Sequence, residues 1–178
     1  MKYLIASDLH GSAYYTELIL NYFTKMNCDR LILLGDILYH GPRNPVPYGH
    51  DPKKCFEMLN KYADKIICVK GNCDAAIDDM VLDFPILAPY FIMEVHGRLV
   101  FFTHGDIFNS EHLPMKDIVL VHGHTHVQRC EQHEDHVYLN PGSIAVPKPD
   151  NYHGFMTLED GIFSWYDEDG TKKNEYRI

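Results

Sequence analysis

The sequence of 178 residues has no apolar segment that approaches the roughly 20 residues needed to span a bilayer. Its first apolar run, residues 3–6, ends at Ser7 and Asp8 and is too short for the hydrophobic region of a secretion signal. No C-x-x-C pair occurs, and the cysteines number five. An odd number of unpaired cysteines indicates free thiols in a reducing compartment, so we expect a cytoplasmic protein.

Positive charge is also scarce. The chain has 16 Lys and Arg against 25 Asp and Glu, a formal net charge of −9. This balance argues against bulk electrostatic binding to nucleic acid or to an anionic membrane surface. An anionic substrate would therefore need a local positive centre that the side chains do not supply in bulk. The hydrophobic fraction of 46% is ordinary for a globular domain with a core.

The pattern of apolar residues predicts the secondary structure. The first half alternates buried strands (2–6, 30–34, 65–69) with helices (about 13–27, 52–62). The second half predicts short strands at 91–95, 98–103, 117–122, 127–132, 136–140, 154–160 and 161–167. No repeat, low-complexity tract or linker separates the halves. We expect a single domain, residues 1–178, of two packed sheets with helices outside.

Residues 39–52 interrupt this pattern with four prolines and two glycines, which excludes regular structure. We expect an inserted loop that overhangs the site, because it follows the second strand directly. His40, Arg43 and His50 are candidate substrate contacts in this loop. A stiff surface loop with solvated charges is an equally open interpretation.

Potential metal ligands follow five of the predicted strands. They are Asp8, His10, Asp36, Asn72, His104, His124 and His126. In open α/β sheets, ligands bind beyond the carboxyl ends of the strands, so these side chains are expected to meet at one crevice. Each residue alone also fits a polar turn position, but the joint pattern favours a metal site.

The spacing and chemistry of these residues support the same interpretation. Residues two apart in extended chain point the same way, which pairs Asp8 with His10 and His124 with His126. A mixture of imidazole, carboxylate and amide suits Mn²⁺, Fe or Zn²⁺ better than Ca²⁺. Seven candidates are too many for one ion and suit two ions that share a carboxylate.

The ordered motifs D-x-H, G-D, G-N-x-D, an isolated His and G-H-x-H span residues 8–126 and resemble those of the calcineurin-like metallophosphoesterases. The later N-P-G-S, residues 140–143, resembles the small YfcE-type bacterial phosphodiesterases of that family. The resemblance implies the α/β (α+β) class, as a four-layer αββα sandwich of two mixed β-sheets flanked by helices. It also implies two divalent metal ions, with Mn²⁺ expected and Zn²⁺, Fe or Ni²⁺ as alternatives.

The resemblance further assigns ligands to each ion. The first set is Asp8, His10, Asp36 and His126, and the second is Asn72, His104 and His124 with Asp36 as the bridge. His122 matches no ligand of the family, and we expect it to have a structural or supporting role.

Cys73 departs from the family motif, in which G-N-H-[D/E] places a histidine that helps to protonate the leaving group. A neutral thiol is a poor proton donor and adds no positive charge. The favoured interpretation of Cys73 is a small buried residue that fills space. Asp74 remains and is a candidate to orient the loop or the water network. The catalytic candidates are Asp36, Asn72, Cys73 and Asp74.

These features predict a phosphodiesterase that acts on a small phosphodiester through a metal-activated hydroxide, with weak or no monoesterase activity. A monoester dianion would miss the histidine's charge most. Two other functions stay open: a non-catalytic interaction scaffold of the same fold, and a nucleotide or dinucleotide phosphohydrolase. We also expect a homo-oligomer, either a dimer or a tetramer.

Overall fold

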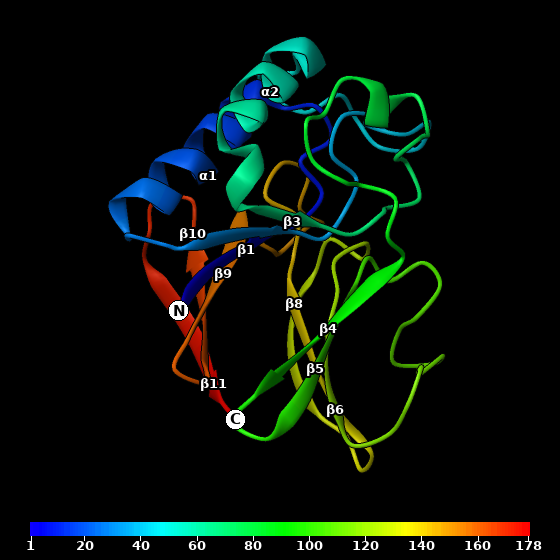
Figure 1. The fold of residues 1–178 in the computed structure, drawn as a ribbon, viewed down its shortest axis with the longest axis vertical. Coiled ribbons are helices and arrows are strands. Elements are labelled where there is room, and N and C mark those ends of the chain that lie inside the picture. Colours follow the sequence, from blue (N-terminus) through cyan, green and yellow to red (C-terminus); the bar gives the residue numbers. More distant parts are fainter.

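The computed structural model describes residues 1–178 and contains two facing β-sheets with helices on the outer side of one of them (Figure 1). The six-stranded sheet has the order β11-β10-β9-β1-β2-β3, and the five-stranded sheet has the order β4-β5-β6-β8-β7. The strands of the first sheet are β1 (Lys2–Ala6), β2 (Arg30–Leu33), β3 (Ile66–Cys68), β9 (Gly154–Glu159), β10 (Ile162–Asp167) and β11 (Lys172–Arg177). The strands of the second sheet are β4 (Tyr90–Val95), β5 (Arg98–Thr103), β6 (Ile118–Val121), β7 (Gln128–Gln132) and β8 (His136–Pro141).

Both sheets are mixed, and their parallel strands decide where the polar ends of the chain segments meet. In the first sheet β1, β2 and β3 run parallel, with Leu4 opposite Leu31 and Leu31 opposite Ile66. In the second sheet β5, β6 and β8 run parallel, with Val100 opposite Val119. Parallel strands with apolar residues throughout are buried on both faces. Only their carboxyl ends are left for polar side chains.

Helices α1 (Ala13–Lys25) and α2 (Pro52–Leu59) cover the first sheet, followed by the 3-10 helices η1 (Asn60–Lys65) and η2 (Asp78–Met80). Helix α1 begins where Ser12 Oγ accepts the N–H of Tyr15 at 3.1 Å. Helix α2 begins at a proline, and Asp51 caps it by accepting the N–H of Lys54 at 3.0 Å. Both predicted helices are confirmed, and each is shorter than expected at its C-terminal end.

Two apolar cores follow from the alternation of side chains along the strands. In β1, Leu4 and Ala6 face the helices, whereas Ile5 faces the space between the sheets. Trp165 of β10 is 1% exposed in that second core. Its Nε1 donates a hydrogen bond of 2.7 Å to the Asn140 carbonyl of β8, which links the two sheets directly.

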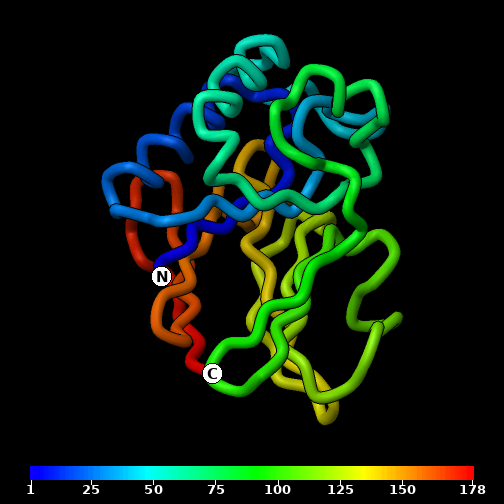
Figure 2. Tube along the Cα trace, in the orientation of Figure 1, coloured from blue at the N-terminus to red at the C-terminus, as the bar shows by residue number.

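The predicted class and the two mixed sheets are confirmed, with two differences. The outer face of the second sheet is covered by the segment 104–117, whose Phe108 and Leu113 pack on Phe101 and its neighbours, and not by a helix (Figure 2). Strand β11 was not expected. This strand pairs only with β10 at the edge of the sheet, where its side chains are mostly exposed. Its polar sequence, KKNEYR, therefore lacks the apolar pattern by which a buried strand is predicted.

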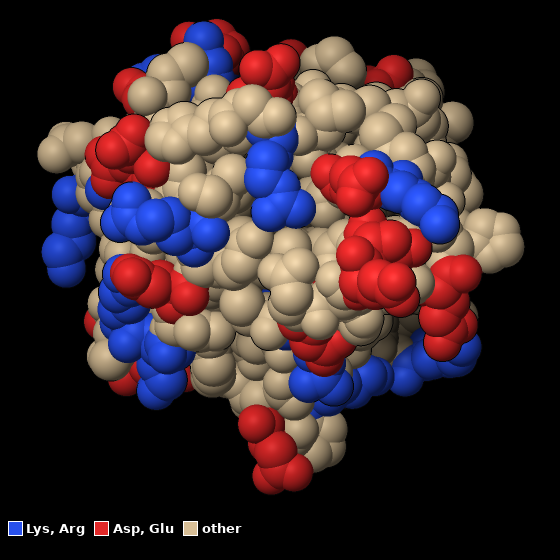
Figure 3. Space-filling model, turned by 90° about the horizontal axis from the view of Figure 1, so that it is seen from below, with Lys and Arg blue, Asp and Glu red and all other residues tan.

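None of the helices combines the length and the apolar composition needed to cross a bilayer. On the face of the molecule seen in Figure 3, acidic and basic side chains are interspersed, and neither sign forms a broad continuous area.

We expect Trp165→Ala to lower the free energy of unfolding by about 3–5 kcal/mol, because it removes a fully buried ring and one inter-sheet hydrogen bond. Urea unfolding measures the change. Ile92→Ala on the outer strand β4, where the side chain is 42% exposed, serves as the control and should cost about 1 kcal/mol or less. Equal losses for the two variants would contradict the assignment of Trp165 to the core between the sheets.

Candidate metal centre and its cleft

The carboxyl ends of β1, β2, β3, β5 and β6 meet at one edge of the two sheets and bring all seven candidate ligands together. Backbone hydrogen bonds tie the loops to one another. The N–H of His10 donates to the Asp36 carbonyl at 2.9 Å, and that of Gly123 donates to the His104 carbonyl at 2.9 Å. The expected convergence of five segments is therefore present.

Five of the candidate ligands have a left-handed backbone. Asp8, His10, Asp36, His124 and His126 have φ angles between 47° and 64°. This conformation costs of order 1–3 kcal/mol for a residue with a side chain. It turns the chain sharply as it leaves each strand and directs the side chains to the common centre. The rest of the fold therefore holds these five residues in a strained backbone conformation at the edge where the candidate ligands meet.

Around Asp8, three hydrogen-bond acceptors face one another. Nε2 of His126 lies 3.2 Å from Asp8 Oδ1 and 3.3 Å from Nε2 of His10. The other ring nitrogens donate to carbonyls, His10 to Tyr39 at 2.9 Å and His126 to Val146 at 2.7 Å. Both Nε2 atoms therefore carry lone pairs, and the buried Asp8 Oδ1 has no hydrogen-bond partner. Converging acceptors without a donor are suited to hold a cation.

A second group forms around His104. Its Nδ1 donates to the Leu34 carbonyl at 2.7 Å, so its Nε2 is an acceptor. That atom lies 3.1 Å from Asn72 Oδ1, 3.1 Å from Nδ1 of His124 and 3.6 Å from Asp36 Oδ2. An amide oxygen, a carboxylate oxygen and ring nitrogens again point to one place.

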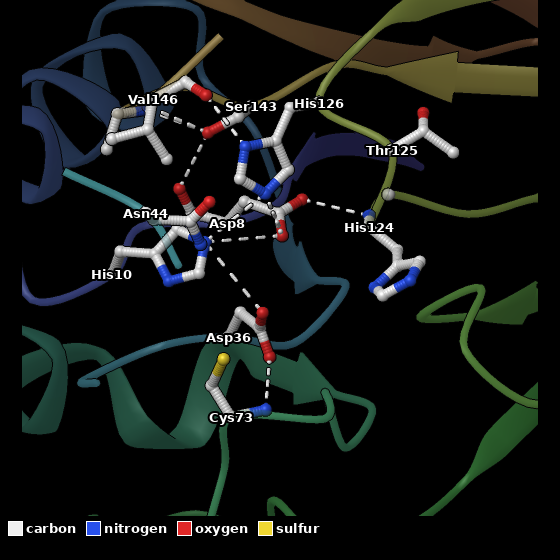
Figure 4. Close-up of polar contacts among 12 residues, drawn as sticks. Asp8, His10, Asp36, Asn44, Cys73, His124, Thr125, His126, Ser143 and Val146 are labelled. Carbon is white, nitrogen blue, oxygen red and sulfur yellow. Dashed lines mark hydrogen bonds and ion pairs between the residues drawn. The ribbon is translucent and has the colours of Figure 1, made fainter. Parts of the chain in front are cut away.

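Asp36 faces His10 of the first group (Figure 4) and His104 of the second. Its Oδ2 is 3.8 Å from Nε2 of His10 and 3.6 Å from Nε2 of His104, whereas its Oδ1 accepts the N–H of Cys73 at 2.8 Å. One oxygen therefore faces both groups, and the other is held by the backbone. This is the position that a shared ligand requires.

Asp74 holds Asp36 in place and does not face the cleft. Its carboxylate accepts the N–H groups of Asp36 at 2.8 Å, Ile37 at 2.8 Å and Gly71 at 2.7 Å. A side chain at Gly71 would collide with Asp36, so only glycine allows the two loops to approach this closely. Of the two roles considered for Asp74, the geometry supports orientation of the loop.

The N-P-G-S segment supports the centre from the other side. Ser143 Oγ donates to the Asp8 carbonyl at 3.0 Å and accepts the N–H of Val146 at 2.9 Å. Asn140 Nδ2 donates to the Gly123 carbonyl at 2.8 Å. The sequence contained this motif, but its role as a clamp between the β1 and β6 loops depends on contacts between distant segments.

Buried carboxylates and imidazoles shift one another's pKa values. Burial opposes the charged form of Asp8, yet the contact with His126 and the positive charge that the imidazoles of His104, His126 and His10 carry when protonated outweigh it and hold the Asp8 pKa below its usual range. Burial likewise opposes protonation of His104 and His126, but the neighbouring carboxylates raise both pKa values. Without a metal, His104 and His126 therefore tend to bind protons at the positions where a metal ion would otherwise balance the carboxylates.

A cleft of about 250 Å³ opens over the centre. It is lined by Asp36, Gly41, Pro42, Arg43, Asn44, Asn72, Cys73, His124, His126 and Lys148. The loop 39–52 therefore borders the centre, and Arg43 lies where it was expected. His40 and His50 do not line the cleft; they pack against each other, with ring centroids 5.3 Å apart. Lys148 and Asn44 were not anticipated, because nothing local in the sequence distinguishes them.

Cys73 borders the cleft and is half-buried, so it is not a space-filling core residue as expected. Its Sγ accepts a hydrogen bond from Asn72 at 3.3 Å and lies close to ligand atoms of His10 and Asp36. Burial and the nearby Asp36 raise the pKa of the thiol to about 12, so it is neutral at neutral pH.

His122 has a packing role. Its ring stacks on Tyr138 with centroids 4.4 Å apart, and burial lowers its pKa to about 4.

Comparison with known proteins agrees with this geometry. The family model described as "Calcineurin-like phosphoesterase superfamily domain" matches residues 1–160. The chain belongs to the calcineurin-like phosphoesterase superfamily. Within it, phosphodiesterase YfcE of Escherichia coli strain K12 is 43% identical over 166 residues, which cover 92% of this chain and 90% of that protein.

Solved structures of the calcineurin-like phosphoesterase fold extend the comparison. The structure of the E. coli phosphoesterase YfcE superposes with a TM-score of 0.95 at 40% identity and covers 100% of both chains. Zinc-bound Vps29 from Entamoeba histolytica superposes with a TM-score of 0.62 at 19% identity, covering 100% of this chain and 98% of the other. At that identity the second likeness concerns the fold alone.

We expect the affinity for Zn²⁺ or Mn²⁺ to fall as the pH is lowered from about 8 to about 6. The pKa values of His104 and His126 are raised, so both rings take up protons at a higher pH than a free imidazole does, and a metal must displace those protons. Calorimetric titration in two buffers of different ionisation enthalpy counts the protons released. Metal binding without proton release near pH 6 would contradict this account.

We expect Asp74→Asn to lower the free energy of unfolding of the metal-free protein by about 2 kcal/mol, because one of its two oxygen acceptors becomes a donor that faces backbone N–H groups. Metal affinity should fall roughly 10- to 100-fold through the displaced Asp36. Asp160→Asn, at an exposed turn, is the matched control and should change neither quantity. If Asp74→Asn behaves like the control, Asp74 does not position the centre.

Proposed function

We propose that the chain is a metal-dependent phosphodiesterase that hydrolyses small phosphodiesters at a centre for two divalent metal ions, with Mn²⁺ as the expected ion. The observation that carries this proposal is the pair of acceptor-only groups that share Asp36 Oδ2 at the floor of an open cleft. The ions, when bound, supply an activated hydroxide and the positive charge that the acidic chain lacks.

The side chains divide the work. Asp8, His10 and His126 would hold one ion together with Asp36, which the lone pairs around Asp8 Oδ1 support. Asn72, His104 and His124 would hold the second ion, again with Asp36. These assignments retain the ligand sets expected from the family resemblance.

Two cations are placed to meet the substrate. Arg43 and Lys148 are the arginine and the lysine that line the cleft, and each can pair with a phosphoryl oxygen. The positive charges of Arg43 and Lys148, together with those of the metal ions, are enough to balance a substrate that has one phosphoryl group. Asp74 acts through Asp36 and is a positioning residue.

Cys73 supports a preference for diesters. Its neutral thiol lies at the cleft and offers neither a ready proton nor a positive charge. A monoester dianion carries more charge to be balanced than a diester monoanion, and it gains less from this site. Leaving groups that depart without protonation should be the most reactive.

Nothing in the cleft favours the alternatives. A non-catalytic scaffold would not need seven side chains directed at one centre, and the likeness to Vps29 concerns the fold alone. We further propose that residues 1–178 act as one domain in the cytoplasm, because both sheets contribute ligands and all five cysteines are free. The homo-oligomer, dimer or tetramer, stays a prediction.

The basic test compares Asp36→Asn with wild type on an aryl phosphodiester in the presence of Mn²⁺. Loss of the shared anionic oxygen should lower kcat/KM by at least about 100-fold, and a chelator should abolish the wild-type activity. Asp160→Asn again provides the control, with unchanged activity. Full activity of Asp36→Asn, or of chelated wild type, would refute a metal-dependent reaction.

We expect Cys73→His to raise monoester turnover relative to diester turnover by about 10- to 100-fold, because it adds a proton donor and a positive charge beside the phosphoryl group. Cys130→His, on the exposed strand β7, is the control. The ratio of the two turnover numbers in each variant is the measurement. An unchanged ratio in Cys73→His would show that the missing histidine does not set the preference.

A further inference from the structure

A second hollow, of about 520 Å³, adjoins the metal cleft. Its walls are residues 44–48 of the proline-rich loop and residues 145–149, with the rings of Tyr15 and His153 beneath them. We call it the proline groove. Asn44 and Lys148 line both the groove and the cleft, so the two spaces are continuous.

Both walls are hydrogen-bonded to the segments that carry metal ligands. His126 donates from Nδ1 to the Val146 carbonyl at 2.7 Å and accepts the N–H of Lys148 at 3.1 Å. On the opposite wall, Ser12 Oγ, two residues beyond His10, donates to the Tyr48 carbonyl at 2.6 Å. The groove therefore has a fixed position relative to the centre, and a group bound in it would be placed without reorganisation of the protein.

The lining selects for an uncharged, apolar group. Four prolines in the two walls present rings and no N–H donors. Val46 and Tyr48 are 62% and 71% exposed, so their apolar surface is open to a ligand. The rings of Tyr15 and His153 stack 4.5 Å apart, and their polar atoms bond to each other at 3.1 Å. What they offer to a ligand is mainly ring surface.

The charges argue in the same direction. No carboxylate lines the groove, and Lys148 is its only cation, located at the junction with the cleft. A polyphosphate or an oligonucleotide would place several further anionic groups against prolines with nothing to balance them. A single phosphoryl group at the junction, with a neutral organic substituent in the groove, leaves no charge unpaired.

The Val146 wall of the groove and Cys73 lie at opposite ends of the ligand group. In Figure 4, Val146 lies beyond His126 at one end, whereas Cys73 lies beyond Asp36 at the other. Cys73 stands where the family has the residue that assists the leaving group. The groove is therefore on the side of the alcohol that is not released.

We propose that the proline groove binds the alcohol that stays on phosphorus, and that the substrates are phosphodiesters whose retained alcohol carries an uncharged aromatic or similarly apolar group. This inference rests on the proposed phosphodiesterase function. A water oxygen bonds to phosphorus, the P–O bond to the other alcohol breaks, and that alcohol takes the proton. The product is the monoester of the retained alcohol, which the site with its neutral Cys73 releases and does not cleave further.

The test uses two diesters with the same leaving group, bis(4-nitrophenyl) phosphate and methyl 4-nitrophenyl phosphate. They differ only in the retained alcohol, aromatic in the first and methyl in the second. In Val46→Ala/Tyr48→Ala, the ratio of kcat/KM for the first over the second should fall about 5- to 10-fold, through a higher KM for the aromatic diester. Comparison of this ratio between variants cancels the different intrinsic reactivities of the two compounds.

The control is Ile92→Ala/Leu99→Ala, which removes two exposed apolar side chains, 42% and 41% exposed, from the β4–β5 hairpin away from the cleft. Its ratio should equal that of wild type. If the groove variant keeps the wild-type ratio, or loses activity equally on both diesters, the groove does not bind the retained alcohol, while the proposed function stands. If wild type with Mn²⁺ hydrolyses neither diester, the proposed function itself fails.

A binding measurement provides a readout independent of turnover. Phenyl phosphate, titrated into the zinc-loaded protein, should shift the methyl resonances of Val46 and Val146, whereas inorganic phosphate should leave Val46 unchanged. Saturation by phenyl phosphate without a shift at Val46 would overturn the assignment of the groove.

Discussion

The shared carboxylate of Asp36 is the constraint on which the site depends. Its backbone N–H is held by Asp74, its Oδ1 by the N–H of Cys73, and its Oδ2 is directed between two imidazoles. A buried carboxylate surrounded by other acceptors is unfavourable unless positive charge lies among them. The fold accepts this cost, and the left-handed backbone at five ligand positions, because parallel strands from two sheets end at the same edge.

The contacts that orient the ligands also shape the surroundings. A histidine ligand must direct one nitrogen to the metal, so its other nitrogen needs a fixed acceptor. Here the acceptors for His10 and His126 are carbonyls of Tyr39 and Val146, which belong to the two irregular segments that border the cleft. The ligand geometry and the shape of the substrate site therefore depend on the same hydrogen bonds. A displacement of either segment would change the orientation of His10 or His126.

The electrostatic design is local. A chain of net charge −9 attracts no polyanion in bulk, and the positive charge at the cleft comes from Arg43, Lys148 and the ions that the centre is built to hold. Cys73 keeps that charge low at the point where the family has a histidine. The proposed diester substrate has a single negative charge, which agrees with this balance and with the apolar lining next to Lys148.

The sequence by itself determined the strands that end in candidate ligands, both helices and which side chains gather at one edge of the sheets. Those features are encoded in short-range patterns, namely apolar runs, helical spacing and the residues that follow each run. The tertiary structure decided the rest: β11 pairs at an edge despite its polar sequence, and the segment 104–117 covers the second sheet without a helix. In the tertiary structure, Lys148 and Cys73 line the cleft, whereas His40 does not and packs against His50. These outcomes depend on how irregular loops pack against segments far away in the chain, and no local periodicity records such contacts.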